Sequence, residues 1–108
     1  MACRWRSGRT PSSGYGTGPP NGYGGGSGNY YWYAETSNPV KDGDFFILRY
    51  DGSACVGAGG IGTIEFYYHM YGSSMGTLQL LASDGATALW TKTGEQHASS
   101  AAPWSQAT

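Results

Sequence analysis

Apolar and polar positions alternate most clearly in residues 64–71, which read I-E-F-Y-Y-H-M-Y. Every second side chain of an extended strand lies on the same face, so one face carries Ile64, Phe66, Tyr68 and Met70. The turn-forming residues Gly-Ser-Ser at 72–74 interrupt the pattern, and residues 77–82 resume it. The pattern predicts two strands joined by a turn into a hairpin.

Similar strand patterns occur on both sides of this unit, at residues 30–37, 44–50 and 87–93 and at the start of a further strand in 104–108. Residues 44–50, D-F-F-I-L-R-Y, are almost continuously apolar, which predicts a strand buried on both faces for part of its length. The dipeptides Asp42-Gly43 and Asp84-Gly85 are strong turn signals. No segment has the periodicity of an amphipathic helix. We therefore expect an all-β fold, with few strands for a complete sandwich.

Residues 1–29 differ in composition from the rest of the chain. They are dense in Gly, Pro and Ser and have almost no apolar periodicity. Composition alone favours a disordered tail, and an ordered loop is the alternative. The chain of 108 residues is long enough for one small domain. That domain would consist of a Gly/Pro/Ser-rich loop segment in 1–29 and β-strands in 30–108.

The charge balance excludes some classes of partner. Charged residues make up 12% of the chain and the formal net charge is −1. The chain therefore lacks the concentration of positive charge that binds nucleic acid or an anionic membrane surface. No apolar run is long enough to cross a bilayer, so we expect no direct membrane insertion. The first residues, M-A-C-R-W-R, lack the apolar stretch of a signal peptide.

A family resemblance appears in residues 68–78. The run Y-H-M-Y-G-S-S-M-G-T-L resembles the central signature of the MAM family (meprin, A5 antigen, receptor phosphatase mu). Upstream, Trp5 and the short motifs T-P-S-S, T-G-P and G-S-G resemble the opening of a MAM domain in order and spacing. The resemblance implies a jelly-roll-like antiparallel β-sandwich in which residues 1–29 form an ordered loop, pinned by Trp5. It implies structural roles for Trp5, Tyr68, His69, Met70, Tyr71, Gly72 and Gly76.

The resemblance also implies that the copy of the domain is incomplete. A full MAM domain has an opening strand before Trp5 and several strands after the W-S-Q-A segment that begins at Trp104, and the family's acidic closing motif is absent here. A truncated sandwich would leave sheet edges unpaired and apolar surface exposed. We therefore expect this polypeptide to be poorly soluble alone.

Glu35 is the candidate cation ligand. It matches a family position at which an acidic residue helps to bind a cation, and carboxylate oxygens suit Ca²⁺. The matching upstream loop, residues 20–23, has no Asp, and Ca²⁺ requires several oxygen ligands. An ordinary surface Glu is the favoured interpretation. No cofactor is expected in this chain, and Ca²⁺ or Na⁺ is a candidate only in a complete domain.

Histidine and cysteine offer no catalytic or metal constellation. His69 has no nucleophile motif beside it, and His97 lies in a distant polar loop without metal-ligand spacing. We interpret His69 as a structural residue that hydrogen-bonds across the sheet or to the following turn. Cys3 and Cys55 could form a disulfide or remain as free thiols. In the family pairing implied for Cys55, the partner position holds Thr63 here.

The aromatic residues suggest binding. A candidate contact surface consists of Tyr31, Tyr33, Tyr67 and Tyr71, with Tyr15 and Tyr23. For Tyr67 and Tyr71 we favour the other interpretation, that they are core residues of a two-sheet sandwich. The resemblance implies a non-catalytic, extracellular or membrane-anchored adhesion module of a larger protein, which binds a protein partner or itself. A carbohydrate-binding jelly-roll module is the alternative. With no catalytic constellation, no enzymatic activity is expected.

Overall fold

A computed structural model of the chain describes residues 2–3, 5–8, 18–19, 21–24, 31–34, 41–51, 53, 57 and 59–108. Its strands are β1 (Ala2–Cys3), β2 (Trp5–Gly8), β3 (Tyr31–Ala34), β4 (Phe45–Phe46), β5 (Phe66–Tyr68), β6 (Thr77–Leu81), β7 (Ala88–Thr93) and β8 (Ser105–Ala107). No α-helix occurs in these described ranges, and the predicted all-β fold is confirmed.

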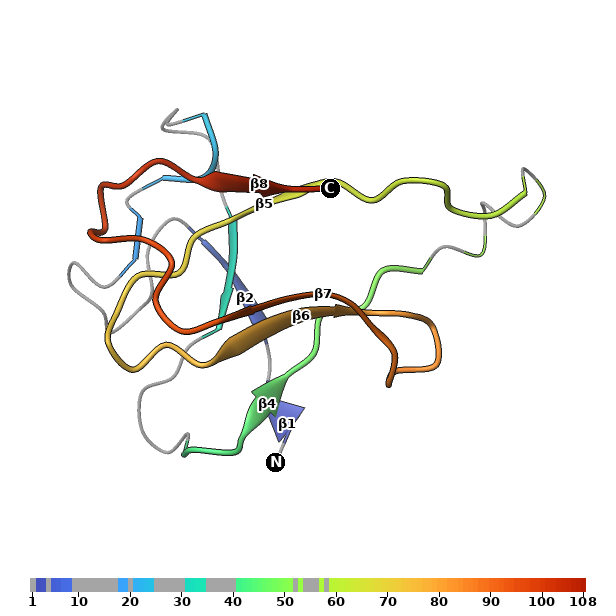
Figure 1. The fold of residues 1–108 in the computed structure, drawn as a ribbon, viewed down its shortest axis with the longest axis horizontal. Helices are drawn as coiled ribbons and strands as arrows, with labels where there is room; N and C mark the ends of the chain where they lie inside the picture. Colours follow the sequence, from blue (N-terminus) through green and yellow to red (C-terminus); the bar gives the residue numbers. More distant parts are fainter. Residues whose placement is uncertain are drawn as a thin grey trace.

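The strands associate in pairs. β2 pairs with β3, β5 with β8 and β6 with β7, all antiparallel, whereas β1 and β4 are parallel. Figure 1 shows the β5–β8 and β6–β7 pairs running in similar directions across the view, one above the other. Each described sheet therefore has two strands and two outer edges, and edges that no strand covers offer backbone hydrogen-bonding groups to another chain.

The hairpin of β6 and β7 follows directly from the sequence. The Asp84 carboxylate accepts hydrogen bonds from the backbone N–H groups of Ala86 and Thr87, both at 2.9 Å, and from the Thr87 hydroxyl. These bonds, that of the Thr87 hydroxyl foremost, lower the pKa of Asp84 to about 2. Gly85 adopts a φ of 72°, a conformation that glycine takes at little cost. The Asp-Gly signal therefore marks a real turn.

The predicted hairpin between residues 64–71 and 77–82 is wrong. Both segments form strands, but β5 pairs with β8 and β6 pairs with β7. The intervening residues bend the chain from one sheet into the other, with Gly72 at a φ of 132°. The compact Asp84 turn supplies β6 with a neighbour in register, so β6 does not fold back on β5.

Two other segments also differ from expectation. Within residues 44–50 only β4 is strand, and Ile47, Leu48 and Tyr50 are 60%, 54% and 80% exposed instead of buried. These three side chains therefore belong to the surface and not to the core. Residues 1–29, predicted to be loop, contain β1 and β2, because the backbone of Trp5–Gly8 forms a ladder with β3.

Aromatic rings join the β5–β8 pair to the β6–β7 pair. The Trp90 ring of β7 lies 5.0 Å from the rings of both Phe66 and Tyr68 of β5, edge to face in each case. Such geometry is favourable for aromatic pairs. Among the described residues only Met70 and Ala107 are buried hydrophobic residues, at 3% and 4% exposure. The core is therefore thin and depends on Trp90.

The chain exposes more surface than its mass requires. Its accessible surface is 7728 Å², whereas a compact monomer of 11.4 kDa would expose about 5,800 Å². The radius of gyration is 14.7 Å, against about 13 Å for a compact domain of this length. In Figure 1 the residues that lead into β5 extend beyond the paired strands. The molecule thus has the openness expected of an incompletely covered β-fold.

Candidate functional site

Two histidines from distant parts of the sequence meet beside β5. His69 follows β5 directly, and His97 lies in the connection from β7 to β8. Their rings stack with centroids 4.3 Å apart and an interplanar angle of 13°. The backbone N–H groups of Gln96 and His97 both donate to the Met70 carbonyl, at 2.8 and 2.9 Å, and this places the second ring.

Hydrogen bonds fix the protonation of His97, which is 6% exposed. Its Nδ1 accepts the backbone N–H of Met70 at 2.9 Å, so Nδ1 carries no proton. The neutral ring is then protonated on Nε2, which lies 3.0 Å from the Ser105 hydroxyl oxygen and donates to it.

This tautomer determines the chemistry open to the Ser105–His97 pair. A histidine that activates a serine must accept the hydroxyl proton on the nitrogen facing it, with the other nitrogen protonated and oriented by a carboxylate or carbonyl. Here the nitrogen that faces Ser105 already carries the proton, and the other nitrogen accepts from a backbone amide. In this arrangement His97 orients Ser105 and β8 but does not remove the serine proton.

His69 is also held as a neutral ring. Its Nε2–H donates to the Ala102 carbonyl, which is 3.0 Å away. Its Nδ1 is buried without a hydrogen-bond partner among the described residues. Burial lowers the pKa of His69, and a charge on His97 would lower it further, although the bond to Ala102 acts in the opposite direction. His69 therefore makes a structural hydrogen bond, but its acceptor is in the loop before β8 and not across the sheet or in the following turn, where the sequence predicted it.

We expect the stability of the chain to fall with acidification partly through His69. The folded-state pKa of this imidazole is lower than its ordinary value of 6.5. Below pH 6.5 the unfolded chain therefore binds a proton that the folded chain does not, and the free energy of unfolding decreases until the lower folded pKa is reached. His69→Gln keeps a donor for Ala102 but does not titrate. Urea titrations from pH 7.5 to 5 should show a shallower decline for this variant, and identical slopes would contradict the assignment.

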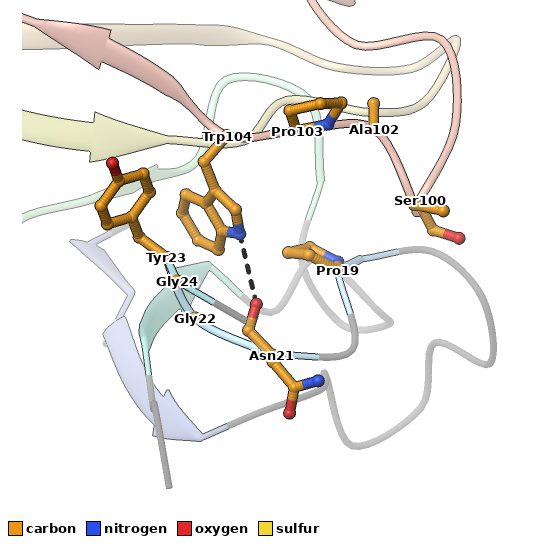
Figure 2. A pocket seen from close by; sticks show the side chains of 10 residues that line it. Pro19, Asn21, Gly22, Tyr23, Gly24, Ser100, Ala102, Pro103 and Trp104 are labelled. Carbon is orange, nitrogen blue, oxygen red and sulfur yellow. Dashed lines mark hydrogen bonds between the residues drawn. The ribbon is translucent and has the colours of Figure 1, made fainter. Parts of the chain in front are cut away.

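Trp104 extends the cluster toward residues 18–24. Its indole contacts His69 and Tyr31 edge to face, with ring centroids 5.6 and 5.3 Å apart. The indole N–H donates to the Asn21 carbonyl at 3.2 Å (Figure 2), and the Tyr31 hydroxyl donates to the Pro19 carbonyl at 2.6 Å. Burial, followed by the charge of Tyr33, raises the pKa of Tyr31 to about 12, so its hydroxyl remains a donor at neutral pH.

Trp104 forms one wall of an aromatic pocket. This pocket, of about 350 Å³, is lined by Pro19, Asn21, Tyr23, Ser100, Pro103 and Trp104, with glycine and alanine completing it. Figure 2 shows Trp104 projecting from the start of β8 toward the Asn21 loop, with Tyr23 and the two prolines around it. We refer to this site as the aromatic pocket. A volume of this size lies at the lower end of the range for small-ligand sites.

A second hollow is aliphatic. About 520 Å³ in volume, it is lined by Tyr50, Ile61, Ile64, Glu65 and Leu80, together with Thr63 and two glycines. Ile61 and Ile64 are 48% and 37% exposed. We refer to this site as the apolar hollow. The sequence did not reveal it, because residues 44–50 and 64 read as core positions.

Only some of the predicted site residues lie in or beside the histidine cluster. Tyr68, Met70 and Tyr71 lie in or beside the histidine cluster, and the Gly72 N–H donates to the Glu95 carboxylate at 2.7 Å. The Gly76 carbonyl accepts the N–H of Gly94 at 2.9 Å. Trp5 lies in β2 and Cys3 in β1. Glu35 and Cys55 lie outside the described residues. The predictions that depend on them, the cation ligand and the Cys3–Cys55 disulfide, lie outside these residues too.

Several tyrosines are more exposed than a core position would allow. Tyr67 is 37% exposed and Tyr23 54%, while Tyr31, Tyr33 and Tyr71 are half-buried and Tyr15 lies outside the described ranges. The preference for Tyr67 as a core residue is therefore wrong: its ring stacks on that of Tyr23, with centroids 3.6 Å apart, and stays 37% exposed.

Comparisons with known proteins include a partial match to a much longer protein. The chain is 37% identical over 94 residues to thyroid hormone-induced protein B of Xenopus laevis, a match that covers 82% of this chain. The chain spans only 13% of the length of that relative. No family model matches the chain, and no solved structure matches it. These results do not assign the chain to a family.

Within the described ranges, no group of three or more His, Cys, Asp or Glu side chains is arranged to hold a metal ion. The same ranges contain no helix that is both long and apolar enough to span a bilayer.

Proposed function

We propose that the chain is a non-catalytic protein–protein interaction module of an extracellular or membrane-anchored protein. The observation that carries this proposal is the exposed aliphatic and aromatic surface around the apolar hollow, where Tyr50 is 80% exposed. Surfaces of this kind on soluble proteins mark interaction sites. The resemblance of residues 68–78 to the MAM signature supports the same function and is the basis for the extracellular location.

The side chains around the apolar hollow are exposed enough to take part in a contact. Tyr50 is 80% and Ile61 48% exposed, and each partner in a standard interface buries about 800 Å². Tyr50 and Ile61 are suited to act as anchors, because exposed aromatic and aliphatic side chains gain most from burial at the centre of an interface. This surface would be covered if further strands or a partner completed a jelly-roll-like sandwich.

We expect the isolated chain to associate or precipitate at concentrations above the low micromolar range. A double variant, Tyr50→Ser with Ile61→Ser, should remain monomeric about tenfold higher in concentration, because it removes the two side chains that gain most from burial. Sedimentation velocity from 1 to 100 µM measures the difference. Leu89→Ser is the matched control, since Leu89 of β7 is 59% exposed and does not line the hollow.

A panel of extracellular domains displayed on cells extends the test to partners other than a second copy. Binding of the chain that is lost in the double variant and kept in Leu89→Ser supports the proposal. A monodisperse, cooperatively folding monomer that binds no member of the panel contradicts it.

A further inference from the structure

We propose that the aromatic pocket is a binding site for a neutral carbohydrate, separate from the protein contact made by the apolar hollow. The two sites share no lining residue. The pocket belongs to the loops on which residues 18–24 and 98–104 meet, whereas the hollow lies where residues 50 and 60–65 approach β6. Either site can therefore be tested without the other.

The rings of the pocket are fixed before any ligand arrives. Trp104 is held by its N–H bond to Asn21 and by edge contacts with Tyr31 and His69, and His69 also holds the neighbouring Ala102 carbonyl. Tyr23 stacks on Tyr67 at 3.6 Å. Rings that are already ordered lose little conformational entropy on binding, which favours affinity. The rings of Trp104 and Tyr23 therefore provide a preformed binding surface.

The chemistry of the lining selects the ligand class. Aromatic faces carry negative partial charge and attract the polarised C–H groups on the flat side of a sugar ring. None of the side chains that line the pocket is a carboxylate, an amine, a guanidinium or an imidazole. The side-chain amide of Asn21 and the hydroxyl of Ser100 each donate and accept hydrogen bonds, as sugar hydroxyl groups do. An uncharged sugar meets all of these features.

A proline-rich peptide fits less well. Grooves that bind such peptides combine aromatic walls with a donor for the peptide carbonyl groups, a task for which the indole N–H is suited. In this pocket the indole N–H of Trp104 is already bonded to the Asn21 carbonyl. A peptide would therefore have to use the Asn21 amide or the Ser100 hydroxyl as donor, and its binding is the alternative outcome that the experiment must distinguish.

The test titrates the full chain with neutral oligosaccharides. The Tyr50→Ser, Ile61→Ser background keeps the chain monomeric and does not alter the pocket. Cellohexaose, maltohexaose and chitohexaose are the carbohydrate probes, and a proline decapeptide is the competing probe. The ¹H–¹⁵N signal of the Trp104 indole reports contact at the pocket. At least one sugar should shift this signal saturably, with an affinity that changes little between 50 and 500 mM NaCl, because no charge is involved.

Three variants decide between the outcomes. Tyr23→Ser removes an exposed ring and should weaken sugar binding at least tenfold, and Asn21→Ala should weaken it severalfold while leaving the backbone carbonyl that Trp104 uses. Trp32→Ser is the control, because Trp32 of β3 is 55% exposed and lies outside the pocket lining; it should bind as the background does. Preserved amide spectra establish that each variant is folded. Saturation by the proline decapeptide alone, no shift with any sugar at 10 mM, or equal sugar affinity of Tyr23→Ser overturns the proposal.

Discussion

Replacing Trp90 by alanine is expected to remove more than half of the free energy of unfolding of the chain. Trp90 of β7 is the ring that joins the β6–β7 pair to the β5–β8 pair, since it contacts both Phe66 and Tyr68 at 5.0 Å. Truncation of a core tryptophan costs roughly 3–5 kcal/mol, and the lower end applies because this ring is half-buried. A domain of this length has a free energy of unfolding that starts at about 5 kcal/mol. The variant would therefore lose more than half of it.

Urea unfolding followed by far-ultraviolet circular dichroism at low micromolar concentration measures this loss. Trp90→Phe should recover part of the stability, because a smaller ring still reaches one neighbour. Trp32→Ala is the control, since a tryptophan that is 55% exposed has little packing to lose. If Trp90→Ala and Trp32→Ala shift the urea midpoint equally, the contact between the two strand pairs is not what stabilises the fold.

The sequence predicted local structure better than it predicted partners. The two-residue period at 77–82 and 87–93 and the Asp84-Gly85 signal between them lead directly to β6, β7 and their turn. The same period located β5, but its partner is β8, which lies far along the chain. Strand pairing is decided by long-range competition for edges, and residues 64–71 contain nothing that distinguishes β6 from β8 as a neighbour.

The prediction that the apolar run at 44–50 is buried was wrong for a related reason. Such a run predicts burial only if the fold supplies a layer to cover it. Ile47, Leu48 and Tyr50 are each more than half exposed, and the residues that looked like core became surface. This result agrees with the proposed function, because an apolar run that the chain itself does not cover is available to a partner.

The histidine cluster could not be predicted from spacing. His69 and His97 belong to no metal or catalytic motif, and their approach depends on the backbone bonds from Gln96 and His97 to the Met70 carbonyl. The position of Trp104 likewise depends on the carbonyl of Asn21. Every residue has a backbone carbonyl, so the sequence does not indicate which one accepts this bond. Only the richness in aromatic residues indicated that rings would gather, without indicating where.

The two proposed sites differ in openness and local order. The aromatic pocket and the histidine cluster lie where loops are tied by hydrogen bonds to carbonyl groups of Pro19, Asn21 and Ala102. The apolar hollow, in contrast, lies where the chain extends beyond its paired strands. A rigid platform suits a small ligand, because little conformational entropy of the protein is lost on binding, whereas an open apolar surface suits a large partner.

Replacing His97 by alanine is expected to destabilise the fold by about 2–4 kcal/mol. The variant leaves the backbone N–H of Met70 without its acceptor at a residue that is 3% exposed, which costs about 1–3 kcal/mol. It also removes the ring that stacks on His69 and the bond to Ser105. His97→Asn is the informative comparison, because an asparagine side-chain oxygen can accept the Met70 N–H while the bond to Ser105 is lost. Asparagine should therefore recover roughly half of the loss.

Two measurements separate the acceptor from general packing. Urea unfolding gives the free energies of wild type, His97→Ala and His97→Asn, and amide hydrogen exchange reports the Met70 N–H itself. That amide should exchange slowly in wild type, fast in His97→Ala and at an intermediate rate in His97→Asn, because its protection depends on the acceptor. Equal destabilisation by alanine and asparagine, with no difference in Met70 exchange, would show that the imidazole acts only by filling space. The ranking alanine, asparagine, histidine in both measurements would establish that the buried acceptor ties the connection between β7 and β8 to the end of β5.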